Sequence, residues 1–263
     1  MKKSIIVLGL LFAKFALFAQ SINADFETDK QGWTAHFSGI FNEHATEQDG
    51  RIEWAKLPSP LNTRGGISFS GKNHSNVMFL YIQKEITDLA PNTDYRVIFN
   101  MDWVSRMNPS ASPITVKVGA VNKAPMFAGE FVGTYFNDVE EESIEEEESV
   151  EEEKIAEEEG EDENLDREDR TFDDRWLWTA VFDKGEPGRN GRDFRAVGQL
   201  IPNEFGYPFQ QNLHNFDSAF LAKTDESGRL FLMIGVEPEQ GNIENVFLNT
   251  VRVILIENDS KNP

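Results

Sequence analysis

The stretch Tyr95-Arg96-Val97-Ile98-Phe99-Asn100-Met101-Asp102-Trp103 decides the fold class, because a large apolar or aromatic residue occupies every second position. In an extended strand, successive side chains point to opposite faces. The odd-numbered residues of this stretch therefore share one face, while three of the four even-numbered residues are polar or charged. This alternation predicts a strand that buries one face in a core and turns the other toward solvent.

Similar short segments lie on both sides of this strand, and turns rich in Gly, Pro, Asn and Asp separate them. We expect strands over 32–38, 51–57, 66–70, 77–86, 95–104, 114–121, 176–182, 195–200, 230–236 and 246–256. About ten short strands without a long helical pattern predict an all-β sandwich or barrel. The chain has 263 residues, and we expect one β-sandwich domain over 20–263.

Three segments carry a resemblance to a known fold. The chain resembles galactose-binding-like jelly rolls in three places. These are Asp25-Phe26-Glu27 with Gly32-Trp33, the turn and strand over 86–97, and the closing segment over 246–253. Many carbohydrate-binding modules have this fold, so the resemblance implies a jelly-roll β-sandwich with carbohydrate as the ligand. The segment 70–75 is similar to that of a group of exported bacterial sandwich proteins.

One segment, residues 138–169, carries most of the charge of the chain. It holds 20 Asp and Glu against Lys154 and Arg167, so it accounts for −18 of the net charge of −21. It contains few large apolar residues and no aromatic residue, so it cannot bury enough surface to offset its ordering entropy. We expect a disordered acidic loop inserted into a nearly neutral folded body, and a cation or a basic protein is its candidate partner.

The first 19 residues are predicted to be a signal peptide. Lys2 and Lys3 precede an apolar stretch over 5–18, and small residues over 16–19 offer a cleavage site after Ala19. The stretch is too short for a membrane-spanning helix, and no later segment is long and apolar enough to span. We therefore expect a secreted or periplasmic protein, or one at the exterior of the cell envelope; a retained N-terminal anchor is the alternative.

Composition excludes several classes of site. The chain has no Cys, which excludes disulfides, thiol catalysis and Cys-zinc sites. It lacks the basic stripe that a phosphate backbone demands, so we expect no nucleic-acid partner. It also lacks the motifs of serine hydrolases, zinc proteases and phosphate-binding loops.

Aromatic and polar loop residues are the candidate ligand-binding groups. An exposed indole can stack on the apolar C–H face of a sugar ring, which makes Trp54, Trp103 and Trp178 candidates for a binding platform. The alternation around Trp103 and Trp178 equally fits core positions. Asn73 and His74 lie in a polar turn, where they either bind a ligand or satisfy backbone groups.

Calcium is the cofactor that the resemblance suggests. In many galactose-binding-like modules a structural calcium ion joins the first strand to the last. Asp25 and Glu27 supply carboxylates near the first strand, and Asn249 stands in the closing strand where such modules often carry Asp. An amide oxygen can still ligate calcium, so these three residues form the predicted metal site.

Three functions follow from these observations. The leading interpretation is an exported, non-catalytic binding protein of carbohydrate-binding-module type, with a polysaccharide or glycan as ligand. The alternative is an envelope or adhesion scaffold whose acidic loop binds cations or a basic partner. The third interpretation is a carbohydrate-active hydrolase or lyase. A glycosidase requires two carboxylates across a cleft, and Asp102 is a candidate for one of them.

Overall fold

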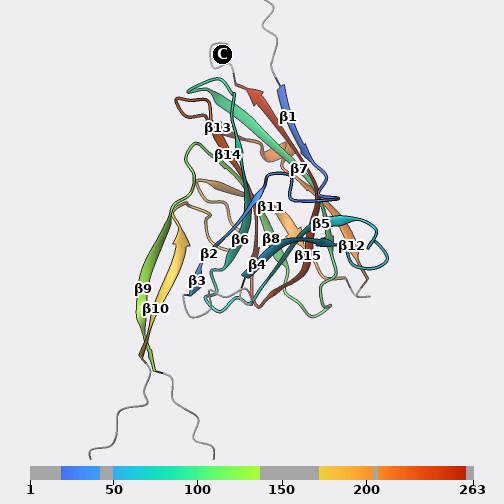
Figure 1. The fold of residues 1–263 in the computed structure, drawn as a ribbon, viewed down its shortest axis with the longest axis vertical. Helices are drawn as coiled ribbons and strands as arrows, with labels where there is room; N and C mark the ends of the chain where they lie inside the picture. The colour runs from blue at the N-terminus through green and yellow to red at the C-terminus, as the bar shows by residue number, and fades with distance from the viewer. Residues whose placement is uncertain (1–18, 42–49, 137–171, 204–206, 259–263) are drawn as a thin grey trace, which may run out of the picture.

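The computed structural model describes residues 19–41, 50–136, 172–203 and 207–258 (Figure 1). These residues form antiparallel strands and a single 3-10 turn. In chain order the elements are β1 (Ala19–Ala24), β2 (Thr34–Ser38), β3 (Ile40–Phe41), β4 (Gly50–Lys56), β5 (Gly65–Gly71), β6 (Phe79–Ile86), β7 (Asp94–Ser105), β8 (Ile114–Val121), β9 (Phe127–Phe136), β10 (Phe172–Ala180), β11 (Phe194–Leu200), β12 (Phe209–His214), η3 (Phe216–Ser218), β13 (Phe220–Lys223), β14 (Leu230–Pro238) and β15 (Ile243–Glu257).

Most strands belong to two facing sheets. One sheet has seven strands in the order β12-β7-β15-β5-β4, with β1 added to β15 and β13 added to β7. The other has five strands in the order β11-β8-β14-β6-β2. The chain crosses repeatedly between the sheets, from β5 to β6 to β7 to β8 and again from β13 to β14 to β15. This arrangement confirms the predicted jelly-roll β-sandwich.

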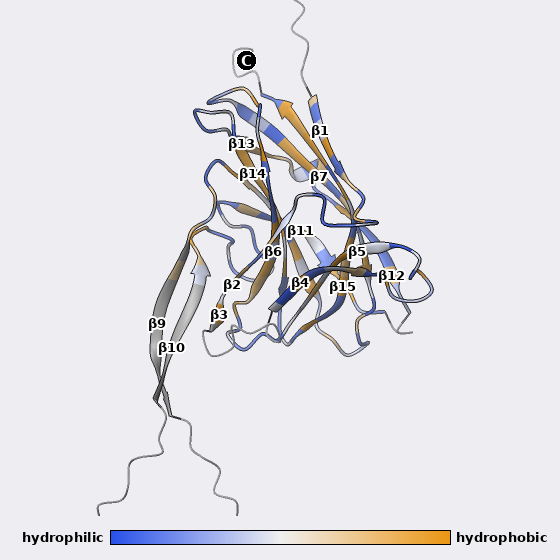
Figure 2. Cartoon of the chain, viewed as in Figure 1, coloured by the Kyte–Doolittle hydropathy of each residue, from blue (hydrophilic) through white to orange (hydrophobic). Residues whose placement is uncertain are grey.

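The alternating stretch of β7 forms the centre of the core. All five of its predicted inward residues, from Tyr95 to Trp103, are buried, whereas Arg96 and Asp102 are exposed. Inward residues of the five-stranded sheet join the same cluster, among them Leu80, Ile82, Val116, Val118, Leu232 and Ile234. Figure 2 shows hydrophobic residues concentrated along the strands and hydrophilic residues in the connecting loops. Each fully buried apolar side chain contributes about 1.5–3 kcal/mol.

The five-stranded sheet is also covered on its outer face. Phe79 and Tyr81 alternate with the core residues of β6, so they point away from the main core and form a second apolar cluster with Phe194 and Met233. Residues 181–193 run over this face. Because both faces are covered, β14 is buried along its whole length and β8 along all but its last residue, which explains their nearly continuous apolar sequences.

A buried ion pair ties the covering segment to the sheet. Lys117 Nζ lies 2.7 Å from Glu237 Oε2 and donates to the carbonyl oxygens of Lys184 at 2.9 Å and Glu186 at 2.8 Å. Lys184 Nζ contacts the other carboxylate oxygen of Glu237. Burial lowers the pKa of Lys117, and Glu237 partly offsets this effect. A buried charge is tolerated only when it is paired and hydrogen-bonded, so these contacts hold residues 184–186 against the sheet.

A hairpin arm formed by β9 and β10 projects from the sandwich (Figure 1). Its register runs from the pair Phe127 and Ala180 to the pair Phe136 and Phe172, and β3 adds to β10. Most of the predicted strand over 176–182 lies in β10, whereas β9 was not predicted. The acidic segment 138–169 follows β9 and precedes β10, and its predicted disorder lies outside the described residues.

No helix in the described ranges has the length and apolar character that a membrane span requires. The predicted signal peptide over 1–19 also lies outside these ranges, except for Ala19, at which β1 begins.

Candidate functional site

The structure places Trp103 in the core and corrects its prediction as a sugar-stacking residue. Its side chain is 0% exposed, and its ring centroid lies 5.7 Å from that of Phe69. The physical reason is the alternation of β7, which turns Trp103 to the same side as Phe99 and Met101. A fully buried indole offers no face to a ligand from solution.

The structure describes the side chain of only one of the other two candidate tryptophans, Trp54. Trp54 is partly buried, and its Nε1 donates to the carbonyl oxygen of Phe26 at 2.9 Å. The ammonium group of Lys56 lies 5.3 Å from its ring centroid. The backbone of Trp178 lies on β10, and its side chain lies outside the described residues. The ligand-binding roles of both residues stay predictions.

Asn73 and His74 lie in the turn between β5 and β6. Asn73 Oδ1 accepts a hydrogen bond from the backbone N–H of Met78 at 3.2 Å. The backbone N–H of His74 donates to the carbonyl oxygen of Lys72 at 3.1 Å, and the His74 side chain is exposed. Asn73 thus satisfies a backbone group, which is the structural alternative to ligand binding.

Glu27 and Asn249 come together as predicted, but Arg64 lies between them. Arg64 Nε is 3.0 Å from Glu27 Oε1, and Arg64 Nη2 donates to Asn249 Oδ1. Asn249 is buried, and its Nδ2 donates to the carbonyl oxygen of Gly65 at 2.8 Å. The network therefore joins the segment after β1 to both β5 and β15. Hydrogen bonding to Arg64 lowers the pKa of Glu27.

Asp25, the third predicted metal ligand, makes separate contacts. Its Oδ1 accepts hydrogen bonds from Gln31 Nε2 at 2.6 Å and from the backbone N–H of Glu27 at 3.2 Å. The described residues contain no group of three His, Cys, Asp or Glu side chains placed to hold a metal ion. Calcium at the oxygens of Glu27 and Asn249 requires displacement of the Arg64 guanidinium, so these side chains as placed fit an arginine rather than calcium.

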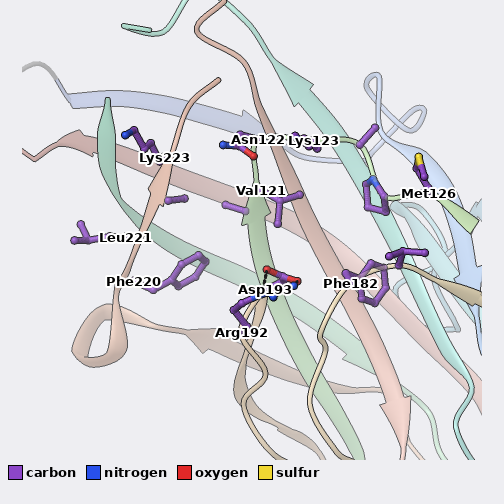
Figure 3. A pocket seen from close by; sticks show the side chains of 15 residues that line it. Val121, Asn122, Lys123, Met126, Phe182, Arg192, Asp193, Phe220, Leu221 and Lys223 are labelled. Carbon is purple, nitrogen blue, oxygen red and sulfur yellow. Dashed lines mark hydrogen bonds and ion pairs between the residues drawn. The ribbon is translucent and has the colours of Figure 1, made fainter. Parts of the chain in front are cut away.

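A groove of about 580 Å³ lies between the two sheets (Figure 3). Its walls come from three segments that are distant in sequence, namely residues 120–126, residues 181–193 and residues 220–223. The first segment continues from β8 of the five-stranded sheet, and the third is β13 of the seven-stranded sheet. The groove therefore exists only because the sandwich brings one wall from each sheet together.

Apolar side chains line much of the groove. Met126, Val181 and Leu221 are 71%, 61% and 57% exposed, and the partly buried rings of Phe182 and Phe220 lie beside them. Binding sites for organic ligands combine such apolar surface with a few placed polar groups. A cluster of exposed apolar side chains in a hollow is therefore a candidate contact surface.

A closed set of hydrogen bonds shapes the wall over 181–193. Asp183 accepts the backbone N–H groups of Gly185 and Arg192, both at 2.9 Å, and its own N–H donates to Asp193 Oδ2 at 2.8 Å. The hydrogen bond from the N–H of Arg192 is the largest contribution that lowers the pKa of Asp183. Gly191 fits because a Cβ there would lie 2.3 Å from the carbonyl oxygen of Asp183. A wall fixed in this way reduces the ordering cost of binding.

Polar and charged groups complete the groove. Figure 3 shows Asn122 between Lys223 and Lys123 on one side, and Arg192 with Asp193 on the other. Arg192 Nη2 lies 3.1 Å from Asp193 Oδ2. A second hollow of about 550 Å³ adjoins this side, and it shares Asn122 and both lysines with the groove.

Asp102 lies elsewhere, on the outer face of the seven-stranded sheet. Its Oδ2 accepts the hydroxyl of Thr250 at 2.7 Å, and its Oδ1 accepts Asn212 Nδ2 at 2.8 Å. Asp25 lines the same polar hollow of about 360 Å³. Both carboxylate oxygens of Asp102 thus take part in cross-strand hydrogen bonds, which suits a role in joining neighbouring strands.

Sequence reasoning did not find the groove between the sheets. Lys123, Phe182, Leu221 and Lys223 come from segments with no shared spacing, and none lies in a known motif. The available signal was the sequence Phe220-Leu221-Ala222-Lys223, a short apolar segment between polar turns. Its length made it too weak to predict as a strand.

Comparisons with known proteins provide no family. No protein-family model matches the chain. No curated protein matches it either.

Three solved structures are similar to the chain at low levels. The enzymatically active domain of tailspike protein 4 from bacteriophage CBA120 is 9% identical with a TM-score of 0.30, and the match covers 89% of this chain and 20% of that one. The cleaved adhesin domain of Lys-gingipain from Porphyromonas gingivalis is 9% identical with a TM-score of 0.30, and the match covers 92% of this chain and 99% of that one. Arthrobacter globiformis isomalto-dextranase complexed with panose is 8% identical with a TM-score of 0.28, and the match covers 86% of this chain and 24% of that one. The chain thus spans about a fifth of the tailspike and about a quarter of the dextranase. At these levels the likenesses do not bear on function.

Proposed function

We propose that this protein is an exported, non-catalytic carbohydrate-binding protein and that the groove between β8 and β13 is its binding site. The observation that carries the proposal is the combination, in one hollow, of exposed apolar side chains, two phenylalanine rings and an amide with charged groups. The predicted signal peptide and the resemblance of the sequence to galactose-binding-like modules support export and carbohydrate as the ligand class.

The groove offers both kinds of contact that a sugar needs. The apolar side chains of Met126, Leu221 and Phe182 present surface to the C–H faces of sugar rings, and burial of this surface drives association. Asn122 and Arg192 can hydrogen-bond to hydroxyl groups and fix the orientation of the sugar. The wall over 181–193 is formed before binding, so little ordering is required.

Binding to a panel of immobilised polysaccharides tests this function. Met126→Gln and Leu221→Gln remove exposed apolar contacts without opening the core, since both side chains are more than half exposed. We expect each variant to weaken binding of a retained polysaccharide several-fold, because each loses part of the apolar surface that binding buries. Phe37→Gln is the matched control, since Phe37 is 43% exposed on β2 and does not line the groove.

Three results can be distinguished. Loss in Met126→Gln and Leu221→Gln with full binding in Phe37→Gln supports the groove as the site. Absence of binding to every polysaccharide removes the proposed function, and binding that all three variants retain places the site elsewhere.

The envelope or adhesion scaffold is the second candidate, and one observation favours it. Phe136 and Phe172, between which the acidic segment is inserted, are paired on the arm that projects from the sandwich (Figure 1). An acidic segment inserted there is joined to the protein at a distance from the groove, where a cation or a basic protein can reach it. Deleting 138–169 separates the two functions, since carbohydrate binding then survives while a role of the acidic segment is lost.

A further inference from the structure

The charges along the groove indicate which class of glycan it binds, and this inference rests on the function proposed above. We infer that the ligand is an anionic polysaccharide whose carboxylate or sulfate groups pair with Lys123 and Lys223.

Lys123 and Lys223 are the uncommitted charges of the groove. Three cationic side chains and one carboxylate line it. The carboxylate of Asp193 is already engaged, because its Oδ2 lies 3.1 Å from Arg192 Nη2 and accepts the N–H of Asp183 at 2.8 Å. Both lysines are exposed, and within the described part of the chain neither ammonium group has a hydrogen-bond or ion-pair partner. The groove is therefore positive in a chain whose net charge is −21.

Neighbouring arginines differ from these lysines because their guanidinium groups make hydrogen bonds and ion pairs within the protein. Arg195 Nη1 donates to the carbonyl oxygens of Phe194 at 3.0 Å and Arg192 at 3.2 Å. Arg229 Nε lies 2.8 Å from Asp225 Oδ2. Since Lys123 has no such contact in the described structure, its charge is available to a ligand, and it can be removed without breaking a structural bond.

The placement of the two lysines suits an extended ligand. Lys123 follows β8, and Lys223 ends β13, so the two cations come from opposite sheets. Both also line the adjoining hollow of about 550 Å³. A ligand that continues from the groove into this hollow passes both ammonium groups, with Asn122 between them (Figure 3). A polysaccharide with a charge on successive sugars meets both cations, whereas a neutral one leaves them unpaired.

The test compares three oligosaccharides of equal length, namely an oligogalacturonate, a sulfated galactan and a neutral galactan, each titrated into the full chain at low salt. An exposed ion pair contributes roughly two- to fivefold in affinity. We expect Lys123→Gln and Lys223→Gln each to weaken binding of the anionic ligands by this factor and to change binding of the neutral ligand less, because a neutral sugar loses no ion pair. Lys72→Gln is the matched control, because Lys72 is exposed and lines neither hollow.

The outcomes separate this inference from the proposed function. Tighter binding of an anionic ligand, lost in the two groove variants and kept in Lys72→Gln, supports the inference, and the preferred ligand distinguishes carboxylate from sulfate. Equal binding of neutral and anionic ligands overturns the inference while the proposed function stands. No binding of any glycan overturns both. Single-stranded DNA is titrated as a further polyanion, and binding equal to that of the anionic glycans shows recognition of charge alone and overturns the assignment to a glycan.

Discussion

At the scale of single residues, Arg64 joins two segments that lie far apart in the sequence. It bonds to Glu27 and to buried Asn249, so Arg64→Ala leaves a buried amide oxygen without its partner. We expect a loss of about 1–3 kcal/mol in the free energy of unfolding, measured with urea. Arg64→Lys should recover only part of this loss, because an ammonium group keeps the positive charge but lacks the fork geometry of the guanidinium. Arg64→Ala with wild-type stability would contradict the network.

The same variant tests the predicted calcium site. In Arg64→Ala the oxygens of Glu27 and Asn249 are free, so millimolar calcium is expected to raise its melting temperature and to leave that of the wild type unchanged. A rise in the wild type that EDTA reverses would show that calcium binds although Arg64 is present, and it would support the predicted calcium site.

Glu27 also makes stability depend on pH. Its folded pKa lies below the ordinary value of 4.5, chiefly because of the hydrogen bond from Arg64. The ionised carboxylate therefore stabilises the fold above pH 4.5, and this contribution is lost as the pH falls through the lowered folded pKa. At pH 7 we expect the free energy of unfolding to be larger for the wild type than for Glu27→Gln, and we expect this difference to shrink in acid. An equal difference at all pH values in urea unfolding would contradict this assignment.

At the scale of elements, the segment over 181–193 forms a groove wall only while it stays on the outer face of the sheet. Glu237→Gln removes the charge that compensates buried Lys117, so we expect a loss of about 3–5 kcal/mol. The double variant Lys117→Met with Glu237→Leu should recover part of this stability, because neither charge of the fully buried pair remains, although Lys184 loses its partner. Thermal unfolding measures both, and a double variant as unstable as the single one would show that the ion pair is not the cause.

The elements also show what the sequence determines locally. All ten predicted strands are present. Their sequence patterns reflect their burial: the alternation of 95–104 belongs to a strand with one buried face, and the apolar run of 230–236 belongs to a strand that is buried on both faces. The five strands that were missed are β1, β3, β9, β12 and β13. Several are short or polar: β3 has two residues, and β12 reads Phe209-Gln210-Gln211-Asn212-Leu213-His214. Such strands gain stability from pairing with a neighbour, which a local pattern does not reveal.

The candidate site was predictable only in part for a related reason. Glu27 and Asn249 were placed together because the resemblance related the first strand to the last, and the structure confirms this proximity. Arg64, which links them, belongs to a turn with no distinguishing pattern. Trp103 was misassigned as a binding residue although its own alternation fits the core. The groove depends on how two sheets meet, which is a property of the tertiary fold.

At the scale of the whole molecule, the acidic segment 138–169 opposes the ligand that the groove is proposed to bind. Deleting it removes a charge of −18 and leaves three residues between Phe136 and Phe172, which are already paired and can close as a short hairpin. We expect the variant to keep its fold and to bind oligogalacturonate more tightly at low salt, because long-range repulsion is lost. Calorimetric titration at low salt and at about 1 M salt, where the screening length is about 3 Å, measures the effect.

The neutral galactan is the control for this deletion, since its affinity does not depend on the net charge of the protein. The gain in affinity for oligogalacturonate should vanish at high salt, because screening already removes the repulsion in the full chain. If the deletion instead abolishes binding of both ligands while the fold persists, the acidic segment contributes directly to recognition. That result would favour the scaffold function, in which the acidic segment rather than the groove between β8 and β13 meets the partner.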